Sequence, residues 1–144
     1  MVRGFSCIGL YNPKTDANVG GALRAASCYS VSMVSIQGIR YQRTSSDTTV
    51  AYRHIPMIHT ESLIDSVPFD CIPIGIELNH KAKDIRTFQH PERAFYIFGP
   101  EDGSIPENVL DRCKFILKIN TKVCMNLAAT VNVVLYDRHL KRNE

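Results

Sequence analysis

Short apolar runs rich in β-forming residues alternate along this chain with stretches of helical character. This alternation restricts the possible folds more than any other feature of the sequence. Strands are predicted at residues 5–11, 33–36, 55–58, 71–77, 94–98 and 115–119. Helices are predicted at residues 18–29, 62–66, 106–113 and 125–141. Strands that alternate with helices are typical of an α/β fold, in which a mostly parallel sheet carries helices on both faces.

Individual residues indicate where some of these elements begin or end. Asn18 is a suitable N-cap for the first helix, and Pro106 fits the first turn of the third. Pro56 lacks a backbone donor and favours an edge position for the strand at 55–58. The polar stretch 37–52 is predicted as a loop, and residues 79–88 as connecting structure.

The composition is that of an ordinary globular protein, with 144 residues of which 44% are hydrophobic and 22% charged. We expect one domain spanning residues 1–144. No apolar run approaches the roughly 20 residues that cross a bilayer, and no secretory signal is recognised, so we expect a cytoplasmic protein without a membrane partner. The net charge of +3 is too small to identify a nucleic-acid partner by itself. Basic residues gather at 40–54, 81–86 and 138–142, where solvated surface is an equally good explanation.

Cysteine and histidine spacing gives no indication of a metal centre. The five cysteines are widely spaced without a C-x-x-C pair, and the five histidines lack ligand spacing. We expect no metal, and we interpret most of the cysteines as small buried hydrophobic residues. They are Cys7, Cys28, Cys71, Cys113 and Cys124.

Three stretches carry polar residues that the folding pattern does not require: 18–24, 98–103 and 124–127. Each lies where a predicted strand gives way to a helix or turn, which is where α/β proteins bind ligands. Taken singly, they also fit packing glycines with a surface arginine, a turn, and an N-cap. Glu101 is the least explained, since it could pair with Arg24, accept hydrogen bonds from a neighbouring loop, or cap a backbone.

The three stretches, in this order, resemble the motifs of the SPOUT superfamily of RNA methyltransferases, in its SpoU/TrmH branch. The first motif, N-x-G-x-x-x-R, is matched by Asn18, Gly20 and Arg24. The second, F-G-x-E, is matched by Phe98, Gly99 and Glu101. The third is matched by Ile119, Met125, Asn126, Leu127 and Ala128.

The sequence departs from the family pattern at a few positions. Asn120 replaces the usual proline and Cys124 the usual serine of the third motif. In the second motif only Asp102 separates Glu101 from Gly103, so Gly103 or Ser104 must fill the later turn.

The resemblance implies a fold that composition could not indicate, with a deep trefoil knot in the C-terminal part. It also implies a homodimer and S-adenosylmethionine bound by the loops of the knot, with no metal. The residues implied as cofactor contacts are Ile76, Glu77, Gly99, Ile119, Cys124 and Met125. Loss of the serine hydroxyl at Cys124 leaves a backbone contact possible.

In the implied reaction, a methyl group passes from a sulfonium to a ribose 2′-hydroxyl of RNA. Arg24 matches the family's proposed activator, and it could act as a base or stay charged and stabilise the developing alkoxide. Asn18, Glu101 and Asn126 would fix Arg24 and the knot loops through hydrogen bonds.

The chain resembles the minimal family members that methylate the wobble ribose of the tRNA anticodon, so tRNA is favoured over rRNA as the partner. A ribosomal RNA target, a tRNA D-loop ribose, or a non-catalytic member that binds RNA or the cofactor stay open as alternatives. An unrelated nucleotide-binding domain would predict a glycine-rich phosphate loop, and the sequence contains none.

Overall fold

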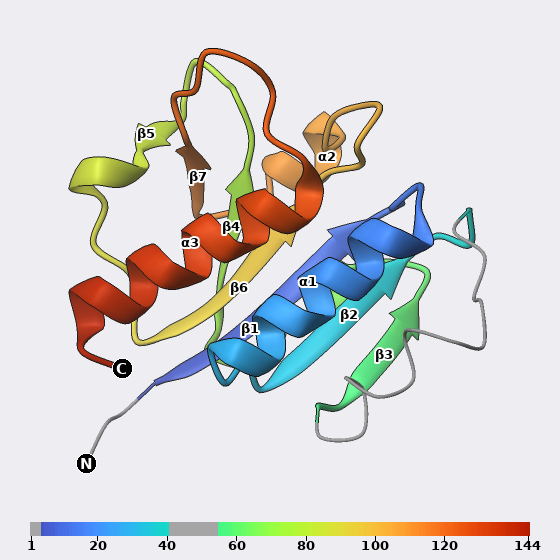
Figure 1. The fold of residues 1–144 in the computed structure, drawn as a ribbon, viewed down its shortest axis with the longest axis horizontal. Helices are drawn as coiled ribbons and strands as arrows, with labels where there is room; N and C mark the ends of the chain where they lie inside the picture. Colours follow the sequence, from blue (N-terminus) through green and yellow to red (C-terminus); the bar gives the residue numbers. More distant parts are fainter. Residues whose placement is uncertain (1–3, 41–54) are drawn as a thin grey trace.

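The computed structural model describes residues 4–40 and 55–144, so most of the predicted loop at 37–52 lies outside the described residues. Its centre is a seven-stranded sheet in the order β3-β2-β1-β6-β4-β7-β5, and every described pair of strands is parallel (Figure 1). The strands are β1 (Phe5–Tyr11), β2 (Met33–Gln37), β3 (Met57–Thr60), β4 (Ile72–Ile76), β5 (Lys83–Asp84), β6 (Arg93–Phe98) and β7 (Phe115–Lys118). The predicted parallel α/β sheet is confirmed.

Two strands differ from the prediction. The strand predicted at 55–58 is β3, which starts at Met57. Pro56 accepts a hydrogen bond from the Val34 N–H of β2 at 2.9 Å but has no N–H to donate in return. The edge position of β3 is confirmed. The short β5 lies inside the stretch predicted as connecting structure, and its two charged residues form no apolar run that periodicity could detect.

The helices also differ in their bounds from the predicted ones. They are α1 (Asp16–Cys28), α2 (Glu107–Leu110) and α3 (Leu127–Arg142), with short 3₁₀ helices η2 (Ile64–Ser66) and η3 (Ile85–Thr87). The N-cap of α1 is Thr15 and not Asn18: the Thr15 hydroxyl accepts a hydrogen bond from the Asn18 N–H at 3.3 Å. Pro106 is the N-cap of α2, and that helix ends at Leu110.

Helices cover both faces of the sheet, as predicted. On one face α1 and α3 lie side by side (Figure 1) and pack on a core formed by residues of β1, β2, β4, β6 and β7, and on the other α2 and η2 close a smaller core. A Cβ added to Gly21 of α1 would come within 2.7 Å of the Ala128 Cβ on α3. Close helix packing therefore explains this glycine without a ligand.

The C-terminal half of α3 is fastened to the sheet by a buried arginine. Arg138 is only 2% exposed. Its guanidinium donates hydrogen bonds to the carbonyls of Pro91 and Glu92 and to the Tyr96 hydroxyl, and forms an ion pair with Glu144 at 3.1 Å. All of its charge is therefore used inside the fold, as the burial of a cation requires.

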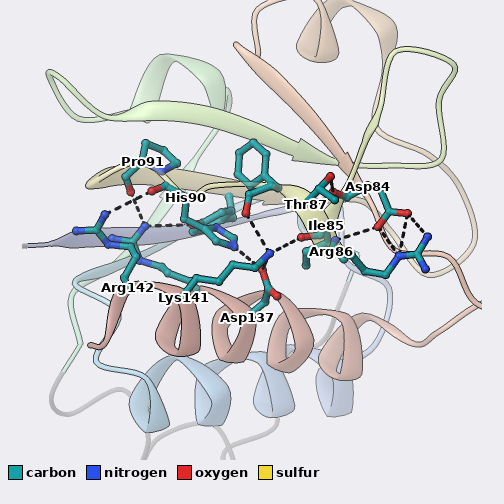
Figure 2. Close-up of polar contacts among 12 residues, drawn as sticks. Asp84, Ile85, Arg86, Thr87, His90, Pro91, Asp137, Lys141 and Arg142 are labelled. Atoms are coloured by element: carbon teal, nitrogen blue, oxygen red, sulfur yellow. Dashed lines mark hydrogen bonds and ion pairs between the residues drawn. The ribbon is translucent and has the colours of Figure 1, made fainter.

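A histidine extends this polar network. The His90 ring lies 2.7 Å from both the Tyr96 hydroxyl and the Asp137 carboxylate, and Lys141 pairs with the same carboxylate at 2.9 Å. Figure 2 shows His90, Asp137 and Lys141 meeting on one side of α3, with the Lys141 ammonium also reaching the carbonyl of Ile85. Burial lowers the pKa of His90, although Asp137 opposes this effect. Neutral His90 then donates to Asp137 and accepts from Tyr96, so every group has a partner.

The cysteines follow their predicted role only in part. Cys7 and Cys71 are buried, Cys113 is half-buried, and Cys28 and Cys124 are exposed, so the prediction that most of the five are buried is wrong. Burial raises the pKa of the Cys7 thiol to about 12. Within residues 4–40 and 55–144, none of the helices is both long and apolar enough to span a membrane.

Candidate functional site

A pocket of about 200 Å³ opens at the carboxyl ends of β4, β6 and β7, beside the start of α3. This is the edge at which parallel α/β sheets bind ligands. The wall includes all six residues that the sequence predicted as cofactor contacts: Ile76, Glu77, Gly99, Ile119, Cys124 and Met125. The other lining residues are Leu78, Phe98, Pro100, Glu101, Gly103, Thr121, Leu127 and Thr130.

The charge of this wall has one sign. It contains two carboxylates, from Glu77 and Glu101, and no lysine, arginine or histidine. The remaining wall is apolar apart from a cysteine, two threonines and backbone groups. A pocket of this kind suits a ligand with an apolar ring and a positive charge better than a bare phosphate.

Glu77 fixes the shape of the pocket through the loop that follows β6. Its Oε2 accepts a hydrogen bond from the Ile105 N–H at 3.0 Å. Ile105 in turn packs against Gly99, because a Cβ at Gly99 would lie 3.2 Å from the Ile105 side chain. The packing of this loop therefore explains the glycine at position 99 even without a bound ligand.

Glu101 joins the loop after β6 to the start of α1. Its carboxylate accepts hydrogen bonds from the backbone N–H groups of Lys14 and Thr15, both at 3.0 Å, and from the Asn18 side chain at 3.1 Å. Partial burial alone would raise the pKa of Glu101, but these hydrogen bonds outweigh burial and lower it. Of the roles considered from the sequence, Glu101 accepts from a neighbouring loop and caps its backbone.

Asn126 is the N-cap of α3 and lies in the chain between Met125 and Leu127, which line the pocket. Its side-chain oxygen accepts a hydrogen bond from the Ala129 N–H at 2.7 Å. The interpretation of Asn126 as a cap is confirmed. Its anchoring of a knot stays a prediction.

Arg24 does not join these residues. It is exposed on α1 and is not among the residues that line the pocket. Within the described part of the chain, no hydrogen bond reaches it from Asn18, Glu101 or Asn126, although the sequence predicted that these residues would fix it. Its predicted part in catalysis stays a prediction.

The two unusual residues of the third stretch have different surroundings. Cys124 is exposed and lines the pocket. Asn120 donates a hydrogen bond from its side-chain nitrogen to the Asp84 carboxylate on β5, at 3.1 Å. It therefore ties the loop between β7 and α3 to the edge strand, which a proline could not do.

Several site residues were not predicted from the sequence. The Lys14 and Thr15 amides that hold Glu101 are invisible to motif analysis, because backbone donors leave no side-chain signature. Thr15 itself could have been found, since a threonine followed by Asp16 is a common helix start. Among the residues that the structure describes, no group of three or more His, Cys, Asp or Glu side chains is arranged to hold a metal ion.

Three of the solved structures that share this fold are of proteins described as methylating or modifying RNA. A protein studied for the 2-OH methylation of C/U34 on tRNA is 21% identical, with a TM-score of 0.80, and the match covers 96% of each chain. An AdoMet-bound rRNA methyltransferase from Sinorhizobium meliloti is 19% identical, with a TM-score of 0.81, over 96% of this chain and 57% of that one. A TrmH/SpoU tRNA modifying enzyme from A. aeolicus is 10% identical, with a TM-score of 0.85, over 99% and 79%. These likenesses establish the fold.

The comparison with curated proteins gave no match. The model of the SpoU rRNA Methylase family matches residues 6–136, which is nearly the whole chain and includes all three stretches singled out in the sequence. The resemblance seen in the motifs is thereby confirmed, and the chain belongs to the SpoU rRNA methylase family.

Proposed function

We propose that this protein is an S-adenosylmethionine-dependent methyltransferase that modifies a ribose 2′-hydroxyl of RNA, with tRNA as its substrate. The observation that carries the proposal is that one pocket, at the carboxyl edge of the sheet, is lined by all six residues that the family resemblance implied as cofactor contacts. Membership of a methylase family supports the same activity.

The pocket residues fit this cofactor. S-adenosylmethionine supplies an activated methyl group on a positively charged sulfonium when it is bound. Glu77 and Glu101 provide negative potential near that charge, and no basic lining residue opposes it. Phe98, Ile119 and Leu127 offer apolar surface to an adenine ring.

Arg24 is proposed to act on the RNA. Its side chain is exposed and forms no hydrogen bond or ion pair with another described residue, so it can bind a phosphate or ribose without losing an internal partner. In this role the guanidinium stays charged and stabilises the negative charge that develops on the ribose oxygen as the hydroxyl loses its proton to solvent water and takes up the methyl group. Glu101 and Asn18 are positioning residues, because they hold the start of the helix that carries Arg24.

A homodimer is also part of the proposal. Val133, Tyr136 and Leu140 form a stripe along α3, at the spacing of one helix face, and they are 37%, 53% and 61% exposed. An apolar stripe of this kind on a water-facing helix suits burial against a second copy of the chain.

Size-exclusion chromatography with light scattering should detect a dimer that Tyr136→Glu disrupts. The matched change of another exposed aromatic residue, Phe69→Glu, should leave it intact.

The trefoil knot is proposed on the order of the strands. β7 lies between β4 and β5, although β4, β5 and β6 all precede it in the chain. We therefore propose that the segment after β7 passes the connection between β4 and β6 before it becomes α3. This arrangement supports a threaded chain, which is otherwise rare in proteins.

The assignment to tRNA rests on how much of each similar structure's length this chain matches. The structure studied for C/U34 methylation on tRNA matches this chain over 96% of both lengths, whereas the rRNA methyltransferase matches over only 57% of its own. We therefore propose the wobble ribose of the anticodon as the target, and an rRNA ribose is the alternative outcome of the test below.

The decisive experiment has two steps. Calorimetry should show S-adenosylmethionine binding to the folded protein, and its absence would refute the enzyme assignment. Mass spectrometry should then map ribose methylation on bulk tRNA and rRNA for wild type, for Arg24→Ala and for the control Arg112→Ala, whose exposed arginine pairs with Asp65 away from the pocket. Loss of methylation only in Arg24→Ala is expected. Equal methylation by all three proteins would remove Arg24 from the mechanism, and methylation on a base would overturn the substrate class.

A further inference from the structure

The positive charge of this protein is concentrated at one edge of the sheet. Residues 81–86 and 114–122 contain six lysines or arginines and one acid, Asp84, in a chain whose net charge is +3. The rest of the chain is therefore net negative. These two stretches lie together because β5 is the edge strand and pairs with β7.

Five lysines of these stretches have no ion-pair partner in the described part of the chain. We call them the lysine edge: Lys81, Lys83, Lys114, Lys118 and Lys122. The cations elsewhere differ, since Arg40, Arg112 and Lys141 each pair with a carboxylate within 3.0 Å. A paired cation must give up its partner to bind a new anion, whereas an unpaired one need not.

Two of these ammonium groups approach the same aromatic ring. The Nζ atoms of Lys83 and Lys114 lie 4.9 Å and 5.8 Å from the centre of the Phe115 ring. With Lys81 they line a hollow of about 180 Å³ that is separate from the pocket at the carboxyl ends. Like charges gathered around one ring repel each other, and a bound anion relieves that repulsion.

The acids near these lysines form no ion pair with them in the described part of the chain. Asp84 is held by Arg86, whose guanidinium donates to it at 2.7 Å, as Figure 2 shows, and this contact lowers the pKa of Asp84 to about 2. The charge of Lys118 also helps slightly to lower the pKa of Asp84. Glu107 of α2 and Asp111, the C-cap of that helix, border the hollow, and among the described residues neither forms an ion pair with its lysines. The lysines therefore keep their charge available to solvent.

The lysine edge leads toward the proposed active site. From Lys114 to Lys118 the chain covers about 13 Å at 3.3 Å per residue. Lys122 follows in the loop whose neighbours Thr121 and Cys124 line the pocket. Asn120 fastens this loop to Asp84, so the tie links the edge strand to the pocket wall.

We propose that the lysine edge binds the ribose-phosphate backbone of the substrate RNA and directs a nucleotide toward the pocket. The inference rests on the proposed function, because it takes RNA as the partner. Polyphosphate backbones are recognised chiefly by lysine and arginine, through release of bound counterions. The distance covered equals the axial rise of about four nucleotides of one duplex strand, so several phosphates can be contacted together.

The test measures binding of bulk tRNA by fluorescence anisotropy over a range of salt concentrations. In the triple variant Lys81→Gln, Lys83→Gln, Lys114→Gln, we expect affinity to fall about tenfold or more, and the salt slope of log K to shrink by about 2, or about 0.7 per lost contact. Calorimetry should show unchanged S-adenosylmethionine affinity in this variant, because none of the three residues lines the pocket. Wild-type affinity and slope in the triple variant would overturn the proposal.

A matched pair of single variants controls for net charge. Lys114→Gln and Arg112→Gln each remove one exposed positive charge, two residues apart, but Arg112 is turned toward Asp65. Only Lys114→Gln should weaken RNA binding, and equal losses would overturn the proposal. In wild type, bulk tRNA should protect Lys83 and Lys114 from chemical acetylation, and unchanged acetylation would count against it.

The remaining outcomes separate this inference from the proposed function. If wild type methylates RNA while the triple variant binds RNA normally, only the lysine edge is refuted. If wild type binds tRNA through these lysines but neither binds S-adenosylmethionine nor methylates, only the enzyme assignment fails. Lysines on an edge strand also discourage sheet-to-sheet association, so aggregation of the triple variant with unchanged RNA binding would assign them that role instead.

Discussion

The two ends of α3 are held in different ways. At the C-terminal end, Arg138 and His90 lie in a buried network in which each polar group has a partner. At the N-terminal end, a single side-chain cap from Asn126 begins the helix, and the preceding residues 121–124 are exposed beside the pocket. The difference separates two tasks, because one end provides stability and the other leaves surface free for ligands. Changes at the first end should unfold the protein, and changes at the second should alter binding.

The strongest test of this contrast is Arg138→Leu. Removal of the guanidinium leaves the carbonyls of Pro91 and Glu92 and the Glu144 carboxylate without their donor, so we expect a loss of about 3–5 kcal/mol in the free energy of unfolding. Urea denaturation measures it. The exposed pair of Arg112 with Asp65 is the control, and Arg112→Leu should cost about 1 kcal/mol or less. Similar losses in the two variants would contradict a stabilising role for the buried network.

Glu101→Gln changes a residue that lines the pocket near the start of α3, and it should lower the free energy of unfolding by less than Arg138→Leu does. The amide keeps the shape but loses the charge that strengthens the hydrogen bonds from Lys14, Thr15 and Asn18. Since the group is partly exposed, we expect a loss of about 1–2 kcal/mol in unfolding free energy. Affinity for S-adenosylmethionine, measured by calorimetry, should fall as well. An unchanged affinity would show that the Glu101 charge does not reach the ligand.

The His90 network predicts a pH dependence. Unfolded histidine gains its proton near pH 6.5, whereas burial lowers the pKa of folded His90. Between these two values the unfolded chain binds more protons, so stability falls as the pH drops below about 6.5, by at most about 1.4 kcal/mol per pH unit. Denaturation between pH 7.5 and 5.5 should reveal this slope. It should flatten in His90→Gln but persist in His80→Gln, whose histidine is exposed. A slope that survives in His90→Gln would assign the effect to other groups.

Asn126→Ala should cost about 1 kcal/mol, the usual worth of an N-cap. Because the first turn of α3 forms a wall of the pocket through Leu127 and Thr130, the cofactor should also bind more weakly. Asn126→Asp keeps the cap and should restore stability, as thermal unfolding can show. If Asn126→Ala changed stability alone, the cap would be separable from the pocket.

The sequence predicted the regular part of this fold better than its junctions. The period of Leu127, Val131, Val134 and Leu135 identified α3, because those residues form its buried face. The cap of α1 was missed by three residues, since Thr15 and Asn18 are both capable caps. Glu101, which is distant in the sequence, accepts hydrogen bonds from both residues, and this contact could not be read from the local sequence around the helix start.

The candidate site shows the same limit. The family resemblance named six cofactor contacts, and all six line one pocket, because parallel strands bring their carboxyl ends to one edge. The surroundings of Arg24 could not be predicted, since an exposed side chain takes its partners from molecules outside the chain.

The smallest expected effect is that of Cys124→Ser, which restores the residue usual in the family motif. Cys124 is exposed, so the change should alter the unfolding free energy by no more than about 0.5 kcal/mol. Since the residue lines the pocket, its backbone can contact the cofactor with either side chain. We therefore expect affinity for S-adenosylmethionine to change by less than about threefold, or about 0.65 kcal/mol, because a neutral hydrogen bond made by an exposed side chain contributes near the lower end of the usual range of about 0.5–1.5 kcal/mol. A tenfold gain in calorimetry would show instead that the missing hydroxyl weakens this pocket. That result would extend the contrast between the two ends of α3, since one atom at the open end would then alter binding without altering stability.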